Sequence, residues 1–429
     1  MHKSNLPSII SSSHNEVIQS CLIYNEIVFL GLRNGFIEIF EYKKNTKISE
    51  MTNFFDSEEK KSEKEMKYNP HSHQIISIQL LKELPQSKDI VIFIQSRGGI
   101  IFIIKYNIKN SIYKLLIKYD SKIETFTEFF ITNKIFRKDW DTLYKNIPNE
   151  KDTYKIMYPL EKNNEIEILF YTIDDDDSTG SNIINNTKDT LEKINQNFDY
   201  IVDEEGQKII DVYKDLESKI LQLIHLSKND NNYMVMVYET TLIFILDENM
   251  NYISHYSLSF SLKLYESIIN IYSFKYKNDY FICIGLFAKN LIILKFDNQK
   301  KELKLFEIIK DICPEVKYGI SCFTVGIVKS NDLFIDEDLI QNKFLFFVGT
   351  YSKRVKIFEI IDEKEEKEEK EKIDNNNNII NINNNEEKIK FMDLGNLIVD
   401  NSGAINQIKF FDGNLFVVCD RKILYIYSI

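Results

Sequence analysis

The sequence has few of the residues that mark metal sites and disulfide frameworks. It holds six histidines and five cysteines in 429 residues, and the cysteines form no C-x-x-C pair. Only His71 and His73 lie close together, without further ligands at the spacing that zinc needs. An odd, scattered set of thiols is typical of a reducing compartment. We therefore expect no bound metal, and a cytoplasmic or nuclear location.

Motifs that carry catalysis are also missing. There is no G-x-G-x-x-G, no P-loop and no G-x-S-x-G, and the glycines of Arg97-Gly98-Gly99 stand between two strand-like runs rather than before a helix. The acidic run from Asp174 to Asp177 lacks the alternating spacing and distal glutamate of a calcium loop. These absences predict a protein without a catalytic centre or cofactor.

Long hydrophobic runs and an excess of positive charge are absent as well. The apolar runs break within roughly ten residues, well short of the ~20 that span a bilayer, and residues 1–17 do not resemble a signal peptide. The formal net charge is -11, with a pI near 5.3. We expect neither membrane insertion nor direct nucleic-acid binding through a basic surface.

Strand-forming residues are abundant: 44% of the chain is hydrophobic and 13% aromatic. The segment VIFIQSRGGIIFIIKYNI (91–108) reads as two apolar strands joined by a polar turn. Six further segments repeat this pattern, at 26–42, 154–173, 232–249, 279–296, 343–360 and 414–429. Seven similar hairpins predict a repeat architecture.

Each hairpin has an apolar strand before it, and most have a less regular strand behind it. Four antiparallel strands repeated about seven times predict an all-β, seven-bladed β-propeller in one domain over residues 1–429. The last unit ends after three strands, so residues 5–12 are expected to supply its fourth strand and close the ring. Two adjacent β-sandwiches are the alternative fold.

Two stretches interrupt the repeats. Residues 174–218 are polar and acidic, and we interpret them as an insertion after the third blade. Residues 361–390, with EKEEKEEKEK followed by an asparagine-rich run, are predicted to be a solvated low-complexity insertion in the sixth blade.

The turns between second and third strands should share one face of a propeller with the loops that lead into the blades. These segments carry a set of basic residues that we predict to be an interaction face for an acidic partner. The candidate residues are Arg33, His71, His73, Arg97, Lys289, Lys353, Arg354 and Arg421.

Residues 71–108 resemble a blade of the guanine nucleotide-binding protein subunit beta-like protein 1 and ASTRA-associated protein 1 family, whose members are WD40 propellers. The matching positions are His73, Leu84, Pro85, Gln95, Arg97 and Gly98. The last two units are similar to that family in order and spacing. The Trp-Asp ends of third strands are replaced by pairs such as Phe40-Glu41 and Tyr106-Asn107.

The resemblance implies a non-enzymatic adaptor with protein partners, in a multi-subunit complex. In that family the complexes are a co-chaperone assembly for phosphatidylinositol 3-kinase-related kinases and a chromatin-associated ASTRA assembly. The alternatives are a WD40 subunit of another complex, such as a ubiquitin-ligase receptor or a histone-binding scaffold, a G-protein β subunit, and a propeller hydrolase.

Overall fold

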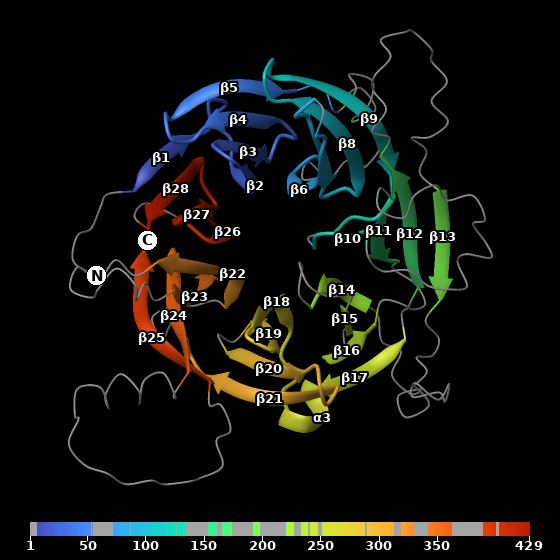
Figure 1. The fold of residues 1–429 in the computed structure, drawn as a ribbon, viewed down its shortest axis with the longest axis vertical. Coiled ribbons are helices and arrows are strands. Elements are labelled where there is room, and N and C mark those ends of the chain that lie inside the picture. Colours follow the sequence, from blue (N-terminus) through green and yellow to red (C-terminus); the bar gives the residue numbers. More distant parts are fainter. Residues whose placement is uncertain are drawn as a thin grey trace.

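The computed structural model describes most of the repeat pattern. The described residues are 7–52, 54, 72–85, 87–125, 127–133, 153–160, 165–173, 192–197, 220–226, 233–238, 241–247, 251–287, 290–312, 319–329, 342–362, 389–399 and 403–429. In this part of the chain, 28 strands form seven four-stranded antiparallel sheets. The sheets are arranged around a central axis, each with its first strand innermost (Figure 1). The predicted seven-bladed β-propeller is confirmed.

The blades follow chain order, and each holds one of the predicted hairpins as its second and third strands. Blade 1 consists of β2 (Ile18–Tyr24), β3 (Ile27–Leu32), β4 (Ile37–Glu41) and β5 (Thr46–Met51). Blade 2 consists of β6 (Ile75–Glu83), β7 (Ile90–Ser96), β8 (Ile100–Asn107) and β9 (Ile112–Asp120). Blade 3 consists of β10 (Phe130–Thr132), β11 (Thr153–Pro159), β12 (Glu165–Thr172) and β13 (Glu192–Asn197).

The second half of the chain continues the pattern. Blade 4 consists of β14 (Ile220–His225), β15 (Met234–Tyr238), β16 (Leu242–Leu246) and β17 (Tyr252–Ser257), followed by the short helix α3 (Leu258–Leu262). Blade 5 consists of β18 (Ile268–Tyr276), β19 (Asp279–Leu286), β20 (Leu291–Asp297) and β21 (Glu302–Ile309). Blade 6 consists of β22 (Ile320–Lys329), β23 (Asn342–Thr350), β24 (Arg354–Asp362) and β25 (Ile389–Ile398).

Blade 7 joins the two ends of the chain. It consists of β26 (Ile405–Phe411), β27 (Asn414–Cys419), β28 (Ile423–Ser428) and β1 (Ser8–Ser11). Strand β1 pairs antiparallel with β28, from Ser8 opposite Ile426 to Ser11 opposite Ile423. The expectation that residues 5–12 close the ring is confirmed, and the closure gives β28 a partner on its outer edge.

The core lies between the blades rather than in one central mass. Seven clusters of buried apolar side chains each join one blade to the next around the ring. The aromatic residues that replace tryptophan in the third strands, such as Phe40, Tyr106, Phe296 and Phe358, are all buried. Because each blade buries its faces only against its neighbours, the fold depends on a complete ring.

A β-bulge repeats at the start of the innermost strand in six of the seven described sheets. In every case the strand begins with isoleucine and the register skips one residue after it, at Ile18, Ile75, Ile220, Ile268, Ile320 and Ile405. A bulge bends its strand and re-aims the side chains beside it. At three of these positions the isoleucine lies against a glycine of the preceding blade, in the pairs Gly31–Ile75, Gly285–Ile320 and Gly349–Ile405.

The isoleucine–glycine contact makes a testable prediction. A Cβ atom on Gly31 would lie 2.6 Å from Cγ2 of Ile75 and 2.4 Å from Oγ of Ser20. We expect Gly31→Ala to lower the free energy of unfolding by about 1–3 kcal/mol, because the blades must shift apart. Gly403→Ala is the control, since its nearest neighbours lie 3.6 Å away. Urea unfolding measures the free energy of unfolding of both variants. Equal losses would contradict the idea that close packing of these glycines against isoleucines joins neighbouring blades.

The described residues cover only part of the two predicted insertions. Residues 192–197, within the stretch 174–218, form β13 and complete blade 3, so the structure corrects this part of the predicted insertion. The segment EKINQN has a single apolar residue, and its backbone pairing with β12 makes it a strand. Residues 174–191 and 198–218 lie outside the described residues, as do residues 363–388 between β24 and β25. No helix in the described part of the chain is long and apolar enough to cross a bilayer.

Candidate functional site

One face of the ring carries both the turns between second and third strands and the loops that lead into the blades; we call it the turn face. The backbone ties these two kinds of segment together. The Arg33 N–H donates to the Val17 carbonyl at 2.9 Å, and the Arg97 N–H donates to the Gln74 carbonyl at 2.8 Å. The same contact recurs between the Tyr351 N–H and the Gly319 carbonyl, at 3.2 Å. The turn face is therefore a connected surface rather than a set of independent loops.

The basic residues predicted for this face differ in exposure. Arg33, Lys353 and Arg421 are exposed, whereas His73, Arg97 and Arg354 are half-buried. His71 and Lys289 lie outside the described residues. The Arg97 Nε atom lies 3.3 Å from the Glu124 carboxylate, and this negative charge offsets the positive charge of Arg97. Among the predicted residues that the structure describes, Arg33, Lys353 and Arg421 are thus the ones that face solvent, and their role in binding stays a prediction.

The turn face also presents aromatic side chains that the sequence did not single out. Tyr265 is 78% exposed, Phe287 53% and Tyr351 40%. Tyr265 lies in the loop that leads into blade 5, while Phe287 and Tyr351 begin the turns after β19 and β23. Large aromatic residues at the surface are enriched in protein-binding hot spots.

The central channel is lined by both apolar side chains and side-chain amides. It encloses a cavity of about 610 Å³, and amides reach it from β2, β14, β18 and β26 as well as from blade 2. The lining amides are Gln19, Gln74, Gln79, Gln222, Asn270, Asn406 and Gln407. Several bind neighbouring backbone groups, as in the 3.0 Å bond from Asn270 Nδ2 to the Ser321 carbonyl. Figure 1 shows β10 and β26 on facing sides of this channel.

Two opposite charges lie in the channel. Gln407 of blade 7 donates through Nε2 to the Glu128 carboxylate at 3.3 Å, which links it to the loop leading into blade 3. Burial lowers the pKa of the Lys409 ammonium, but attraction to Glu128 and weaker charge interactions outweigh it, so that the pKa is raised overall. Lys409 therefore stays protonated at neutral pH, with Glu128 as its main electrostatic partner.

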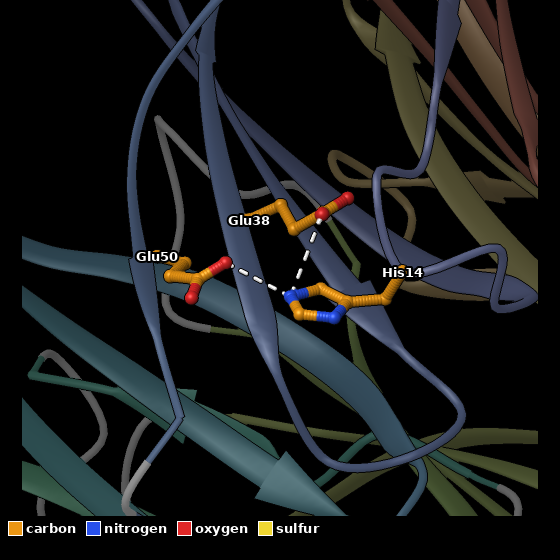
Figure 2. Close-up of side chains that lie close together, drawn as sticks. All are labelled: His14, Glu38 and Glu50. Atoms are coloured by element: carbon orange, nitrogen blue, oxygen red, sulfur yellow. Dashed lines mark hydrogen bonds and ion pairs between the residues drawn. The ribbon is translucent and has the colours of Figure 1, made fainter.

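A further cluster lies where the loop before β2 meets β4 and β5. His14 Nε2 lies 2.8 Å from a Glu50 oxygen and 3.9 Å from a Glu38 oxygen (Figure 2). The three ligand atoms lie within 4.8 Å of one another, close enough to hold a metal ion. However, the Lys47 ammonium binds both carboxylates, at 3.1 Å from Glu38 and 2.5 Å from Glu50. The Lys47 ammonium therefore takes the place that a metal cation would occupy. We call His14, Glu38, Lys47 and Glu50 the ion-paired clamp, because their contacts join the loop before β2 to β4 and β5.

The cysteines that the structure describes are unsuited to nucleophilic chemistry. Cys21, Cys283, Cys322 and Cys419 are free and buried. Burial raises the pKa of the Cys21 and Cys322 thiols to about 12, so both remain protonated at neutral pH.

In blade 4, burial lowers the pKa of His255, whose Nδ1 shares a 2.6 Å hydrogen bond with the Tyr252 hydroxyl.

Comparison with known proteins supports the fold and leaves the family open. No protein-family model and no curated protein sequence matches the chain. Among solved structures, the chain is similar to Raptor from Chaetomium thermophilum, with a TM-score of 0.55, 9% identity and 98% of this chain covered. It is also similar to Sqt1 from Saccharomyces cerevisiae, with a TM-score of 0.51, 12% identity and 98% of this chain covered.

The chain matches 28% of the Raptor chain and 99% of the Sqt1 chain. At these identities the likeness shows the fold alone. It defines a seven-bladed, WD40-like propeller, a class in which binding surfaces rather than the fold decide function. The resemblance to the ASTRA-associated protein 1 family stays a prediction.

Proposed function

We propose that this chain is a WD40-like scaffold that binds other proteins through its turn face. The observation that supports this most is the combination of exposed aromatic and basic side chains on one connected surface. The underlying ring is closed by its own terminal strands, so the loops are held by a rigid frame. A preformed surface loses little conformational entropy on binding, which favours recognition of partners.

We further propose that the scaffold works in the co-chaperone-assisted maturation of phosphatidylinositol 3-kinase-related kinases, in the cytoplasm or the nucleus. This finer proposal is supported by the sequence resemblance of residues 71–108, which form most of blade 2. Two of the matching positions make contacts that join blade 2 to the loop leading into blade 3. Gln95 accepts a 2.9 Å hydrogen bond from the Phe129 N–H, and Arg97 pairs with Glu124.

The test is a native purification of the tagged full-length protein at low salt, with co-purifying proteins identified by mass spectrometry. Recovery of co-chaperone subunits and very large kinases supports the finer proposal. Recovery of ubiquitin-ligase or histone-modifying subunits keeps the scaffold and rejects the co-chaperone assignment. If only general chaperones are recovered, the scaffold proposal itself fails.

Charge reversal on the turn face tests whether its exposed basic residues contribute to partner binding. We expect Arg33→Glu, Lys353→Glu and Arg421→Glu together to reduce partner recovery several-fold, because like charge repels an acidic partner and slows association. The melting temperature should change little, since exposed charges contribute roughly 0–1 kcal/mol each to folding. Full recovery of partners by a folded triple variant would remove these charges from the binding face.

A further inference from the structure

Exposed aromatic side chains gather on one sector of the turn face. Among the described residues, four Phe and Tyr side chains are at least 36% exposed: Tyr265, Phe287, Tyr351 and Phe411. The first three belong to blades 5 and 6 on the turn face, whereas Phe411 lies at the turn between β26 and β27 on the opposite face. The remaining exposed large apolar side chains are aliphatic. This uneven distribution marks the sector formed by blades 5 and 6.

The three aromatic residues rise from backbone segments that contact one another. The Phe287 N–H donates to the Ser267 carbonyl at 3.1 Å, two residues beyond Tyr265. A Cβ atom on Gly319 would lie only 2.6 Å from the Phe287 carbonyl oxygen, so these two backbones touch. The Tyr351 N–H in turn donates to Gly319. Tyr265, Phe287 and Tyr351 therefore stand along one continuous rim, which we call the aromatic rim.

The rim is held in a fixed conformation at its blade 6 end. Lys353 adopts a left-handed backbone conformation with φ of 48°. Its N–H donates to the Gly403 carbonyl at 3.1 Å, and its carbonyl accepts from the Val399 N–H at 2.9 Å. Hydrogen bonds on both sides fix the turn that carries Tyr351. A rigid aromatic surface binds with a small loss of side-chain and loop entropy.

The charge around the rim is positive, in contrast to the chain as a whole. The exposed charged residues of this sector that the structure describes are Lys263, Lys310, Lys353 and Asp311. Half-buried Arg354 and Glu266 add one charge of each sign. The described residues of this sector therefore carry a net charge of about +2, whereas the whole chain has a net charge of -11. Charge complementarity favours an acidic partner here.

We propose that the aromatic rim docks an acidic linear peptide segment that bears bulky apolar side chains, supplied by a partner protein. The apolar side chains would cover Tyr265, Phe287 and Tyr351, and the carboxylates would face Lys263 and Lys353. Aromatic residues supply large contact area on few rotatable bonds, while the lysines steer the approach of the acidic segment. This inference rests on the proposed scaffold function and specifies its surface and the chemistry of its partner.

The experiment uses a display library of random peptides of about twelve residues, selected on the full-length protein. We expect the selected peptides to be rich in Asp and Glu, interspersed with Leu, Ile, Phe or Trp. Tyr265→Ala, Phe287→Ala and Tyr351→Ala together should weaken the best peptide at least roughly tenfold, because hot-spot aromatics dominate such interfaces. Raising the salt from about 50 to about 500 mM should weaken binding several-fold.

Phe411→Ala is the matched control, because it removes an aromatic side chain of comparable exposure from the opposite face. It should leave peptide affinity unchanged, and circular dichroism should show all variants folded. Selection of basic peptides, selection of no peptide above the bare matrix, or binding insensitive to the triple variant would each overturn the docking proposal. In the last two cases, continued co-purification of partners would show that the scaffold function stands without this surface.

Discussion

Replacing Ile10 by aspartate is expected to lower the free energy of unfolding by about 3–5 kcal/mol. Ile10 lies in β1, is fully buried and belongs to the apolar cluster between blades 7 and 1. The substitution removes the packing of the isoleucine and places a carboxylate among Phe416 and Val418. Because β1 is the strand that closes the ring, the loss should appear as a large drop in the melting temperature.

Ile9→Asp provides the control for this prediction. Ile9 neighbours Ile10 in the same strand, but its side chain is 43% exposed. A carboxylate at this position reaches water, so we expect a loss below about 1 kcal/mol. Differential scanning calorimetry on both variants and the wild type measures the difference. If both variants were equally stable, β1 would not be needed to close the propeller.

Replacing Glu38 by alanine should have the second largest effect, lowering the free energy of unfolding by roughly 2–3 kcal/mol. The Glu38 side chain is fully buried and accepts hydrogen bonds from the Ser13 N–H at 3.0 Å and from the Ser13 hydroxyl. The Glu38 carboxylate also forms an ion pair with the Lys47 ammonium at 3.1 Å, and the Lys47 side chain is 28% exposed. Without the carboxylate, these donors lose their acceptor, and the loop that leads into blade 1 is released.

Glu41→Ala on the same strand is the comparison for Glu38. Glu41 pairs with Lys44, whose side chain is 70% exposed, so water replaces the lost contact and the cost should stay below about 1 kcal/mol. Urea unfolding curves of the two variants give the difference directly. A loss at Glu38 no larger than that at Glu41 would show that the ion-paired clamp does not stabilise the loop.

The repeat pattern of the chain predicted most of the fold. Alternating apolar strands around short turns located the central hairpin of every blade, because a hairpin is specified by local sequence. The closing strand was predictable because the last repeat lacked one strand. Strand β13 was missed, since EKINQN carries one apolar residue and is recruited by backbone pairing with β12. The outermost strand of a blade has little apolar area to bury, so its pattern is weak.

The candidate site was less predictable, because side-chain exposure depends on contacts between distant segments. Phe287 directly follows the buried strand β19 and reads in sequence as its last core residue, yet it lies 53% exposed. Tyr265 stands next to leucines in a connecting loop and reads as a buried residue. Arg97 was predicted as an exposed contact, but Glu124 of the next loop lies beside it. Only the folded arrangement of the turn face shows which of these side chains are exposed and which are covered by a neighbouring loop.

The measurement that tests the central claim most directly is a quantitative comparison of co-purifying proteins. Tagged wild type, the triple variant Tyr265→Ala/Phe287→Ala/Tyr351→Ala and Phe411→Ala would be purified in parallel at low salt, after equal folding and abundance are established. The account predicts that the wild type and Phe411→Ala recover the same partners, and that the triple variant loses them at least roughly tenfold. Recovery of the same partners at the same level by all three proteins would contradict a scaffold whose partners bind at the aromatic rim of its turn face.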